Sequence, residues 1–512
     1  MTGPDGPDGR PFPPGDYPLI VVGSGPGALQ TSYSLRALGV PHAIISADDA
    51  PGGMFRRWPF FQRLLSWTKP FAPPAHPSRD FERWDWNSLL GDEPETRAIM
   101  PDLMDGSSSF PSRPEMEENL RLFAERSALR VRYGTRWTAT RKEGESFVLE
   151  TTDGEYRAPT LIFAVGVAQP WKPATPGMEM VSHYADTRTA SSYAAKRIFI
   201  VGKQNSGFEL ASGLLAWARG IVLASPSPAK LSVNTNSLNG IRARYLQPYE
   251  DHAIGGGVSI LNATIESVAR SGEAFRITAR RTDNGSQLLI DADEVIAATG
   301  FVSPLLDLPD LGVATFGQSR LPALTAFFES ASVPGIFFAG TIGQAQSGLK
   351  KHGIPPNSGA VHGARYNARV LARHIARTRF GIDPPRPTMQ ASDLLPFLLA
   401  ELTRGPEIWH QKSYLARVVS VDPEAGLRDE GIMPLSHFLD SGGPDAVAVT
   451  LEADGTGAIY PAVYLRRKDA IEERLMNAHP LLDYETADAR AQMTEILGSL
   501  IPSYATVYSS AK

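Results

Sequence analysis

The chain of 512 residues contains no cysteine, and this absence excludes more chemistry than any other feature of its composition. Disulfide bonds, thiolate metal sites, cysteine nucleophiles and thiol relays all need a sulfur that this chain does not have. An excess of positive charge is also missing, because the formal net charge is -5. Nucleic-acid phosphates are bound by a basic face that this composition does not predict. We therefore expect neither thiol chemistry nor a nucleic-acid partner.

Long apolar runs are absent as well. Runs such as residues 19–22 and 198–201 have the length of a strand, far short of the roughly 20 residues that span a bilayer. The Gly-, Pro- and Asp-rich residues 1–18 lack the basic and apolar parts of a secretory signal. A hydrophobic fraction of 42% and a charged fraction of 21% are typical of globular domains. We expect a water-soluble, cytoplasmic protein without a membrane partner.

Two stretches of the chain share one local pattern, a buried strand followed by a glycine-rich turn and a helix. The first occupies residues 18–38, with a further strand over 42–46, and the second occupies residues 197–218. This order of elements is the dinucleotide-binding unit of the Rossmann fold. The pattern predicts an α/β protein with two Rossmann-like dinucleotide-binding domains, the second inserted in the first, plus a small C-terminal α+β segment.

The first turn has the G-x-G-x-x-A form of the dinucleotide pattern and reads Gly23–Ser24–Gly25–Pro26–Gly27–Ala28. Gly23 permits the tight turn, Gly25 lets the backbone approach a pyrophosphate, and Ala28 allows close packing of helix on strand. The start of the helix adds amide donors and positive potential. The acidic residue that normally ends the second strand is missing, and Asp48 or Asp49 is the candidate that would replace it at the ribose.

The second turn is a looser version that lacks the middle glycine, and its cofactor-binding candidates are Gly202, Gln204, Asn205, Ser206 and Gly207. Its place in a second strand–turn–helix unit strengthens the prediction of a second dinucleotide. The strand that follows it ends without a carboxylate, and Ser225 and Lys230 lie there. Such a site tolerates a 2′-phosphate, so NADPH is favoured and NADH is the alternative. A plain solvent-exposed role for Lys230 also stays open.

Over about residues 17 to 380 the chain resembles the two-dinucleotide flavoproteins, which include flavin-containing monooxygenases, N-hydroxylases and bacillithiol-disulfide reductases. The shared motifs are Pro51–Gly52–Gly53, Ala164–Val165–Gly166, Ala298–Thr299–Gly300–Phe301 and Phe338–Ala339–Gly340–Thr341. The resemblance implies FAD at the first turn and NADPH at the second. It also implies cofactor contacts from Asp48, Gly53, Met54, Gln62, Gly166, Thr299, Gly300, Gly340 and Thr341. Thr341 departs from many relatives, which have an Asp there that binds the ribityl chain of the flavin.

The resemblance also suggests catalytic candidates. The aromatic segment 58–71 corresponds to residues that line the flavin in monooxygenase relatives. Trp67, Thr68 and Lys69 are therefore candidates, and the alternative for Trp67 is a packing role in the hydrophobic core. The segment 349–359 leads into a helix whose start would support negative charge on the reduced flavin. The side chains of His352 and Asn357 are candidates there, as is Lys351, and a plain exposed loop is the alternative for each of them.

Three functions follow from this reading. The first is an NADPH-dependent flavin monooxygenase that uses O2 on a small molecule, by N- or S-hydroxylation or a Baeyer–Villiger reaction, and the run at residues 110–113 is similar to one in those enzymes. The second is a reductase that passes electrons from NAD(P)H to a small acceptor, which the six-residue spacing from Gly177 to His183 favours. The third is a non-catalytic redox sensor. The ten histidines are scattered, so no metal is expected.

We predict five segments along the chain. They are a flexible leader (1–16), the first part of the FAD-binding domain (17–190), the NAD(P)H-binding domain (191–300), the second part of the FAD-binding domain (301–385) and a C-terminal α+β extension (386–512). Within the extension we expect a hairpin over 447–465 and helices over 470–476 and 486–500. The extension would also build the contact of a possible homodimer.

Overall fold

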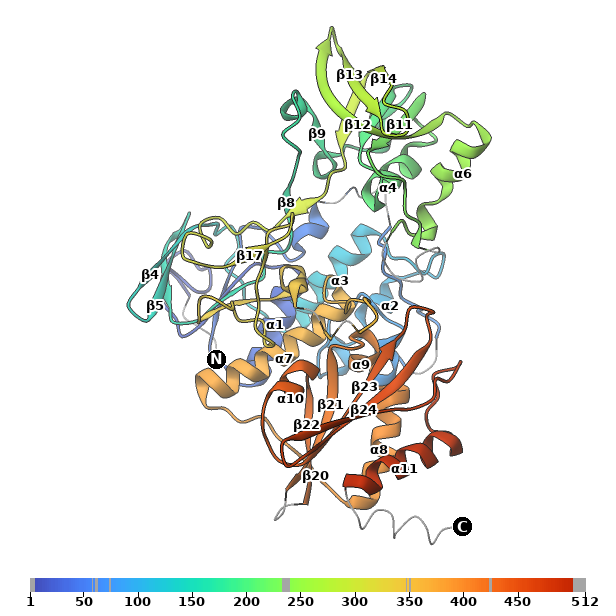
Figure 1. Ribbon diagram of the computed structural model, residues 1–512. Coiled ribbons are helices and arrows are strands. Elements are labelled where there is room, and N and C mark those ends of the chain that lie inside the picture. The colour runs from blue at the N-terminus through green and yellow to red at the C-terminus, as the bar shows by residue number, and fades with distance from the viewer. Residues whose placement is uncertain are drawn as a thin grey trace.

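The computed structural model describes residues 5–57, 59, 63–72, 75–232, 240–346, 348–349, 351–422 and 426–500. Figure 1 shows three parts arranged along the molecule. A seven-stranded sheet lies at one end, a parallel four-stranded sheet in the middle, and a six-stranded sheet at the end where the C-terminus lies.

The central sheet is the first dinucleotide unit. Its order is β19–β7–β2–β3, with β2 (Ile20–Val22), β3 (Ala43–Ile45), β7 (Leu161–Phe163) and β19 (Ile336–Phe338) all parallel. Every residue of these strands is buried, as expected for a parallel sheet covered on both faces. The helices α1 (Pro26–Ala37) and α7 (Val361–Phe380) pack side by side against it.

The second unit enters the chain after β7 and ends before β19, which confirms the predicted insertion of one Rossmann-like unit in the other. Its parallel strands are β9 (Ser182–His183), β15 (Glu294–Ala297), β10 (Arg197–Val201), β11 (Gly220–Ser225) and β12 (Val258–Ser271). Two antiparallel strands, β13 (Ala274–Arg281) and β14 (Gln287–Ala292), extend the sheet. The helices α4 (Asn205–Leu214) and α6 (Gln247–Ile254) belong to this part.

The C-terminal part is an antiparallel sheet with helices. Its strands, in spatial order, are β20 (Thr388–Met389), β22 (Gly426–Pro434), β21 (Leu415–Asp422), β23 (Ala446–Ala453), β24 (Ile459–Arg467) and β25 (Ala470–Leu475). Its helices are α8 (Ala391–Arg404), α9 (Pro406–His410), α10 (Leu435–Asp440) and α11 (Ala487–Leu500). The leucines of α8 and α11 pack on one face of this sheet.

Two secondary-structure predictions in the C-terminal part have different outcomes. The predicted hairpin is confirmed, because β23 pairs with β24 and Asp454 begins the turn between them. The predicted helix over 470–476 is wrong, because these residues form β25 at the edge of the sheet. Lys468 and Asp469 both have positive φ, at 47° and 67°, and this tight two-residue turn reverses the chain onto β24.

The expected flexible leader is also wrong for its described residues. The side chain of Phe12 is buried, and Arg10 forms a 2.9 Å ion pair with Asp153. The strand β1 (Gly15–Asp16) pairs with β6 (Gly154–Ala158) in a sheet that β5 (Ser146–Thr151) and β4 (Trp137–Glu143) complete. Apolar burial and a charged pair therefore fix this segment on the first domain, which its Gly and Pro content did not indicate.

Shorter elements connect the sheets. They are α2 (Ile99–Leu103), α3 (Arg113–Arg126), the strand pairs β8 (Gln169–Pro170) with β16 (Phe301–Val302) and β17 (Thr315–Phe316) with β18 (Leu321–Pro322), and short 3-10 helices at 53–56, 79–83, 94–96, 178–180, 184–186, 190–193, 243–245 and 340–345. Within the described ranges, none of the helices combines the length and the apolar character that crossing a bilayer requires.

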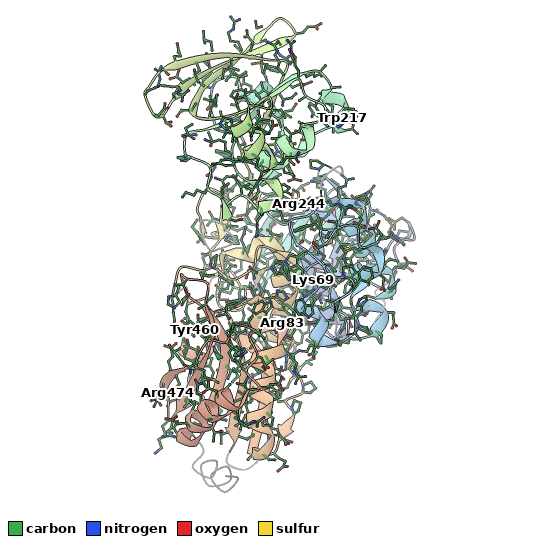
Figure 2. The ribbon with its side chains drawn as sticks, turned by 90° about the vertical axis from the view of Figure 1, so that its right-hand side faces the viewer. Lys69, Arg83, Trp217, Arg244, Tyr460 and Arg474 are labelled. Carbon is green, nitrogen blue, oxygen red and sulfur yellow. The ribbon has the colours of Figure 1, made fainter. Side chains whose placement is uncertain are left out.

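A buried ion network joins the C-terminal part to the rest of the chain. Arg79 lies 2.8 Å from Glu401 and 2.6 Å from Glu407, and both carboxylates are almost fully buried. Arg83 is nearby, with its guanidinium 4.4 Å from the ring centroid of Trp409. Figure 2 labels Arg83 where the aromatic segment of the first domain meets the C-terminal part. The C-terminal part is therefore docked on the first domain rather than tethered to it.

Candidate active site

The first glycine turn is built by close approaches of backbone to backbone. A Cβ on Gly23, where φ is +127°, would lie 2.6 Å from the carbonyl oxygen of Ala164, and a Cβ on Gly27 would lie 2.5 Å from the Cα of Gly340. Gly53 approaches from another side, because a Cβ there would lie 3.0 Å from the Cα of Gly25. The backbones of three segments far apart in sequence, at Gly53, Ala164 and Gly340, therefore lie close to the start of α1. The space beside these backbone contacts is left for a ligand.

A hydrogen-bond network holds Asp48 beside this turn. Ser24 donates to the carboxylate of Asp48 at 3.0 Å, and Ser46 donates to Ser24 at 2.9 Å. Arg57 pairs with the other oxygen of Asp48 at 3.2 Å. Asp49, in contrast, is exposed and pairs with Arg56. Of the two sequence candidates, Asp48 is the one whose carboxylate is placed next to the turn.

The second turn repeats the construction of the first. Gly202 has a φ of +119°, and a Cβ there would lie 2.3 Å from the carbonyl oxygen of Ala298, the counterpart of Ala164. A Cβ on Gly207 would lie 2.4 Å from the carbonyl oxygen of Gly202. In each unit the glycine amide also donates to the end of the next strand, to Ile45 in the first and to Ala224 in the second. The looser sequence pattern thus gives the same turn.

One cavity of about 1530 Å³ connects the two units. Ligand pockets for a single drug-sized molecule typically measure about 300–1,000 Å³, so this cavity has room for more than one ligand. The predicted site residues that line it are Gly23, Gly25, Pro26, Gly27, Asp48, Gly53, Met54, Gly166, Asn205, Gly340, Thr341 and Asn357.

Other predicted residues lie elsewhere. Of the described residues that line the cavity, none is Ala28, Trp67, Thr68, Lys69, Gly202, Gln204, Ser206, Gly207, Ser225, Lys230, Thr299, Gly300 or His352. Gln62 lies outside the described residues. Ala28 is buried inside the first unit, and Ser225 ends β11 while Lys230 is exposed beyond it.

Trp67, Thr68 and Lys69 stand one layer behind the cavity wall. The Trp67 ring packs against the ring of Trp86, which lines the cavity, with the centroids 4.5 Å apart and the planes tilted by 31°. Thr68 is buried and donates to Asp85 at 2.8 Å. The ammonium of Lys69 lies 5.1 Å from the Trp67 ring centroid. Trp86, and none of these three residues, lines the cavity, so their expected contact with the flavin stays a prediction.

Thr299 and Gly300 fix the crossing between the two units. The hydroxyl of Thr299 donates to the carbonyl oxygen of Trp171, and a ring nitrogen of His183 lies 3.0 Å from the carbonyl oxygen of Gly300. Burial lowers the pKa of His183, so its neutral ring serves here as a donor to that carbonyl. The six-residue spacing from Gly177 to His183 thus places this histidine in a structural contact where the chain crosses between the two units.

Residues 351–357, just before α7, contact both the cavity and the C-terminal sheet. Asn357 lines the cavity and donates to the carbonyl oxygen of His410 at 2.7 Å. His352 turns away to the hydroxyl of Tyr460 at 2.9 Å, and Lys351 donates to the hydroxyl of Tyr464 at 2.8 Å. Figure 2 labels Tyr460 on the C-terminal part. His352 therefore connects this loop to the C-terminal sheet.

Three helices begin at the cavity, and none has a side-chain cap at its start. The capping positions are Gly25 for α1, Gln204 for α4 and Ala360 for α7. Backbone amides at such starts have no partner within the helix and carry positive potential. Each start can therefore accept an anionic group, and α1 and α4 are placed as a two-dinucleotide protein requires.

Sequence reasoning missed several polar residues at the cavity, among them His362 and Lys412. His362, at the start of α7, is buried, and neither of its ring nitrogens has a hydrogen-bond partner among the described residues. Its pKa lies well below the usual value because of burial and of nearby Arg365, Lys412 and Arg242. Lys412 follows α9, and burial lowers its pKa to about 7. Neither stands in a sequence motif; only the position of His362 at a predicted helix start was a signal.

Comparison with known proteins agrees with this geometry. Residues 20–340 match the family described as pyridine nucleotide-disulphide oxidoreductase. The chain belongs to this family. The matched residues include both dinucleotide units.

Individual members of the wider group are only distantly similar. The chain is 25% identical over 446 residues to FAD-dependent oxidoreductase domain-containing protein 2 of Mus musculus, a match that covers 80% of this chain and 65% of that relative. The fold matches bacillithiol disulfide reductase Bdr from Staphylococcus aureus (TM-score 0.55, 17% identity, 70% of this chain and 98% of that one). It also matches a flavin-containing monooxygenase from Stenotrophomonas maltophilia (0.52, 19%, 70% and 98%).

Proposed function

We propose that this oxidoreductase is an NADPH-dependent flavin monooxygenase that oxygenates a small molecule by N- or S-hydroxylation or a Baeyer–Villiger reaction. The observation that carries the proposal is the single cavity that joins the first turn to Asn205 of the second unit. A shared cavity lets the nicotinamide reach the flavin directly. Since the chain has no cysteine, electrons cannot pass onward through thiols of its own.

The residues present fit FAD at the first turn. The start of α1 and Gly25 leave room for a pyrophosphate, Gly27, Gly53 and Gly340 let the backbone segments around it approach closely, and Asp48 would bind the ribose. Thr341 lines the cavity where relatives have an Asp, and its hydroxyl would bind the ribityl chain. The uncapped start of α7 would support negative charge on the reduced ring. When bound, the flavin supplies hydride acceptance and the reaction with O2.

NADPH would occupy the second turn. The start of α4 and Asn205 would hold its pyrophosphate, and Ser225 at the end of β11 and the exposed Lys230 beyond it would meet the 2′-phosphate. Arg242 adds a cation at the cavity wall near Asn205, to which its backbone amide donates at 3.0 Å. No carboxylate ends β11, so a 2′-phosphate meets no repulsion there.

A reductase that passes electrons to a small acceptor is the second candidate. The fold match to the bacillithiol disulfide reductase is as good as that to the monooxygenase, which supports it equally. A disulfide substrate would then be reduced by the flavin without help from cysteines of this chain. A non-catalytic redox sensor is the third and weakest candidate, because a binding surface does not need two complete dinucleotide sites on one cavity.

Oxygen dependence separates these functions. FAD-loaded protein is mixed with NADPH without oxygen and flavin bleaching is followed; oxygen is then admitted with candidate amines, sulfides and ketones. A monooxygenase consumes one O2 and one NADPH for each oxygenated product. Turnover of an acceptor such as a quinone without oxygen, with no oxygenated product in air, would overturn the proposal in favour of the reductase. Absence of flavin bleaching by NADPH would contradict both. A cytoplasmic location and a homodimer remain predictions from the sequence.

A further inference from the structure

The C-terminal part supplies one wall of the shared cavity. Trp409, His410 and Lys412 line it at the end of α9, and Gly457 and Ile459 line it from the β23–β24 hairpin. The match to the oxidoreductase family ends at residue 340, so this wall lies outside the part that defines the family. Residues outside the part that defines a family are where substrate selection can differ from one member to the next.

Lys412 is a cation without an anionic partner. Its ammonium donates to the carbonyl oxygen of Trp409 at 2.5 Å and lies 3.8 Å from the centroid of the Trp409 ring. Among the described residues no carboxylate pairs with it, and the charge that acts on it is a second cation, Arg83. A confined ammonium of this kind is costly unless an anion offsets it. Because Lys412 lines the cavity, that anion can come from a ligand.

Flat rings stand close to this ammonium. The Trp86 and His362 rings pack with their centroids 4.2 Å apart and their planes tilted by 33°, and the centroid of the His362 ring lies 5.1 Å from that of His410. Lys412 is near enough for its charge to lower the pKa of both histidines, which burial also lowers. The buried His362 is therefore neutral and has one donor and one acceptor that no described residue uses. Such a pair of nitrogens in a cavity wall points to a polar ligand.

We propose that this wall, together with Trp86 and His362, forms the substrate subsite and that it takes a small aromatic carboxylic acid, with the carboxylate on Lys412 and the flat body against Trp86 and His362. The inference rests on the proposed function, because it treats the occupant as the molecule that is oxidised. A nucleotide phosphate is the other anion that could reach Lys412. The geometry favours the carboxylate, because the uncapped starts of α1 and α4 already provide for the two pyrophosphates.

Binding without turnover tests this subsite. FAD-loaded full-length protein, with no NADPH present, is titrated calorimetrically with phenylacetate and with its neutral isostere phenylacetamide. We expect the wild type to bind phenylacetate at least about tenfold more tightly, the effect of one charge-assisted hydrogen bond. Lys412→Met removes this preference and Lys412→Arg keeps most of it. Lys142→Met is the matched control, since Lys142 is exposed and its ammonium lies 5.8 Å from the Phe147 ring centroid, away from the cavity.

The results distinguish the possible failures. Equal binding of the acid and the amide by the wild type overturns the inference, as does an unchanged preference in Lys412→Met. A Lys412→Met variant that keeps the preference but binds NADPH more weakly would assign the lysine to the nucleotide and also overturn it. If Lys412→Met does not retain FAD, Lys412→Arg decides, because the arginine must preserve the preference. Since no step requires electron transfer, failure of NADPH to reduce the flavin would sink the proposed function and leave this test intact.

Discussion

Replacing Gly25 or Gly27 by alanine separates cofactor binding from folding. Gly25 has a φ of -77°, and a Cβ there would lie 3.9 Å from the Cα of Gly53, an ordinary contact that the protein tolerates. At Gly27 the Cβ would lie 2.5 Å from the Cα and 2.7 Å from the nitrogen of Gly340, where backbone meets backbone and no side chain can move aside. The first change therefore fills only ligand space, and the second breaks the fold locally.

The expected magnitudes differ accordingly. In Gly25→Ala the methyl group obstructs one amide–phosphate hydrogen bond, worth about 1.5–3 kcal/mol, so FAD affinity falls about tenfold to hundredfold. The FAD-free protein loses at most about 1 kcal/mol, because alanine is a poorer N-cap than glycine. In Gly27→Ala overpacking costs about 1–3 kcal/mol in the FAD-free protein, and the helix propensity of alanine offsets about 1 kcal/mol of that at most.

Two measurements check this pair. Urea unfolding of the FAD-free proteins gives the free energy of unfolding, and titration with FAD, followed by flavin fluorescence, gives the dissociation constant. Wild-type FAD affinity in Gly25→Ala would refute the placement of the pyrophosphate at this turn. A larger loss of stability in Gly25→Ala than in Gly27→Ala would refute the reasoning from backbone contacts.

Three further outcomes follow from the same contacts. Arg79→Met leaves the buried Glu407 without its ion pair and Glu401 with only Arg417, 4.0 Å away, and lowers the free energy of urea unfolding by about 3 kcal/mol, whereas Arg121→Met, which breaks only exposed pairs on α3, leaves it nearly unchanged; similar losses in both would contradict the burial argument. The preference for phenylacetate over phenylacetamide falls as pH rises from about 6 to about 8, because Lys412, whose pKa burial lowers to about 7, loses its proton over this range. The nearby histidines stay neutral and Arg83 stays charged, so neither changes the result. Lys412→Arg keeps a flat profile in the same calorimetric titration, and a wild-type preference that does not change with pH would speak against Lys412. Asp48→Asn weakens FAD binding about fivefold in the fluorescence titration, and an unchanged dissociation constant would mean that Asp48 only holds Ser24.

The sequence determined those features that depend on residues close together in the chain. A glycine turn between a buried strand and a helix is a local structure, because only glycine tolerates the positive φ and the contact with the neighbouring strand end at Gly23 and Gly202. Both units, their insertion and the residues of the first turn that line the cavity could therefore be predicted. The hairpin at Asp454 was predictable for the same reason, whereas β25 was not, since its pairing with β24 outweighed its helical composition.

Tertiary structure alone decided which side chains reach the cavity. Trp67, Thr68 and Lys69 occupy the predicted segment, yet Trp86, some twenty residues later, forms the wall in front of them. Lys412 reaches the same wall from an extension with no motif, because the buried ion pairs of Arg79 dock that extension on the first domain. Such contacts join residues hundreds of positions apart, and their energy depends on burial and pairing in the folded chain, which no local pattern records.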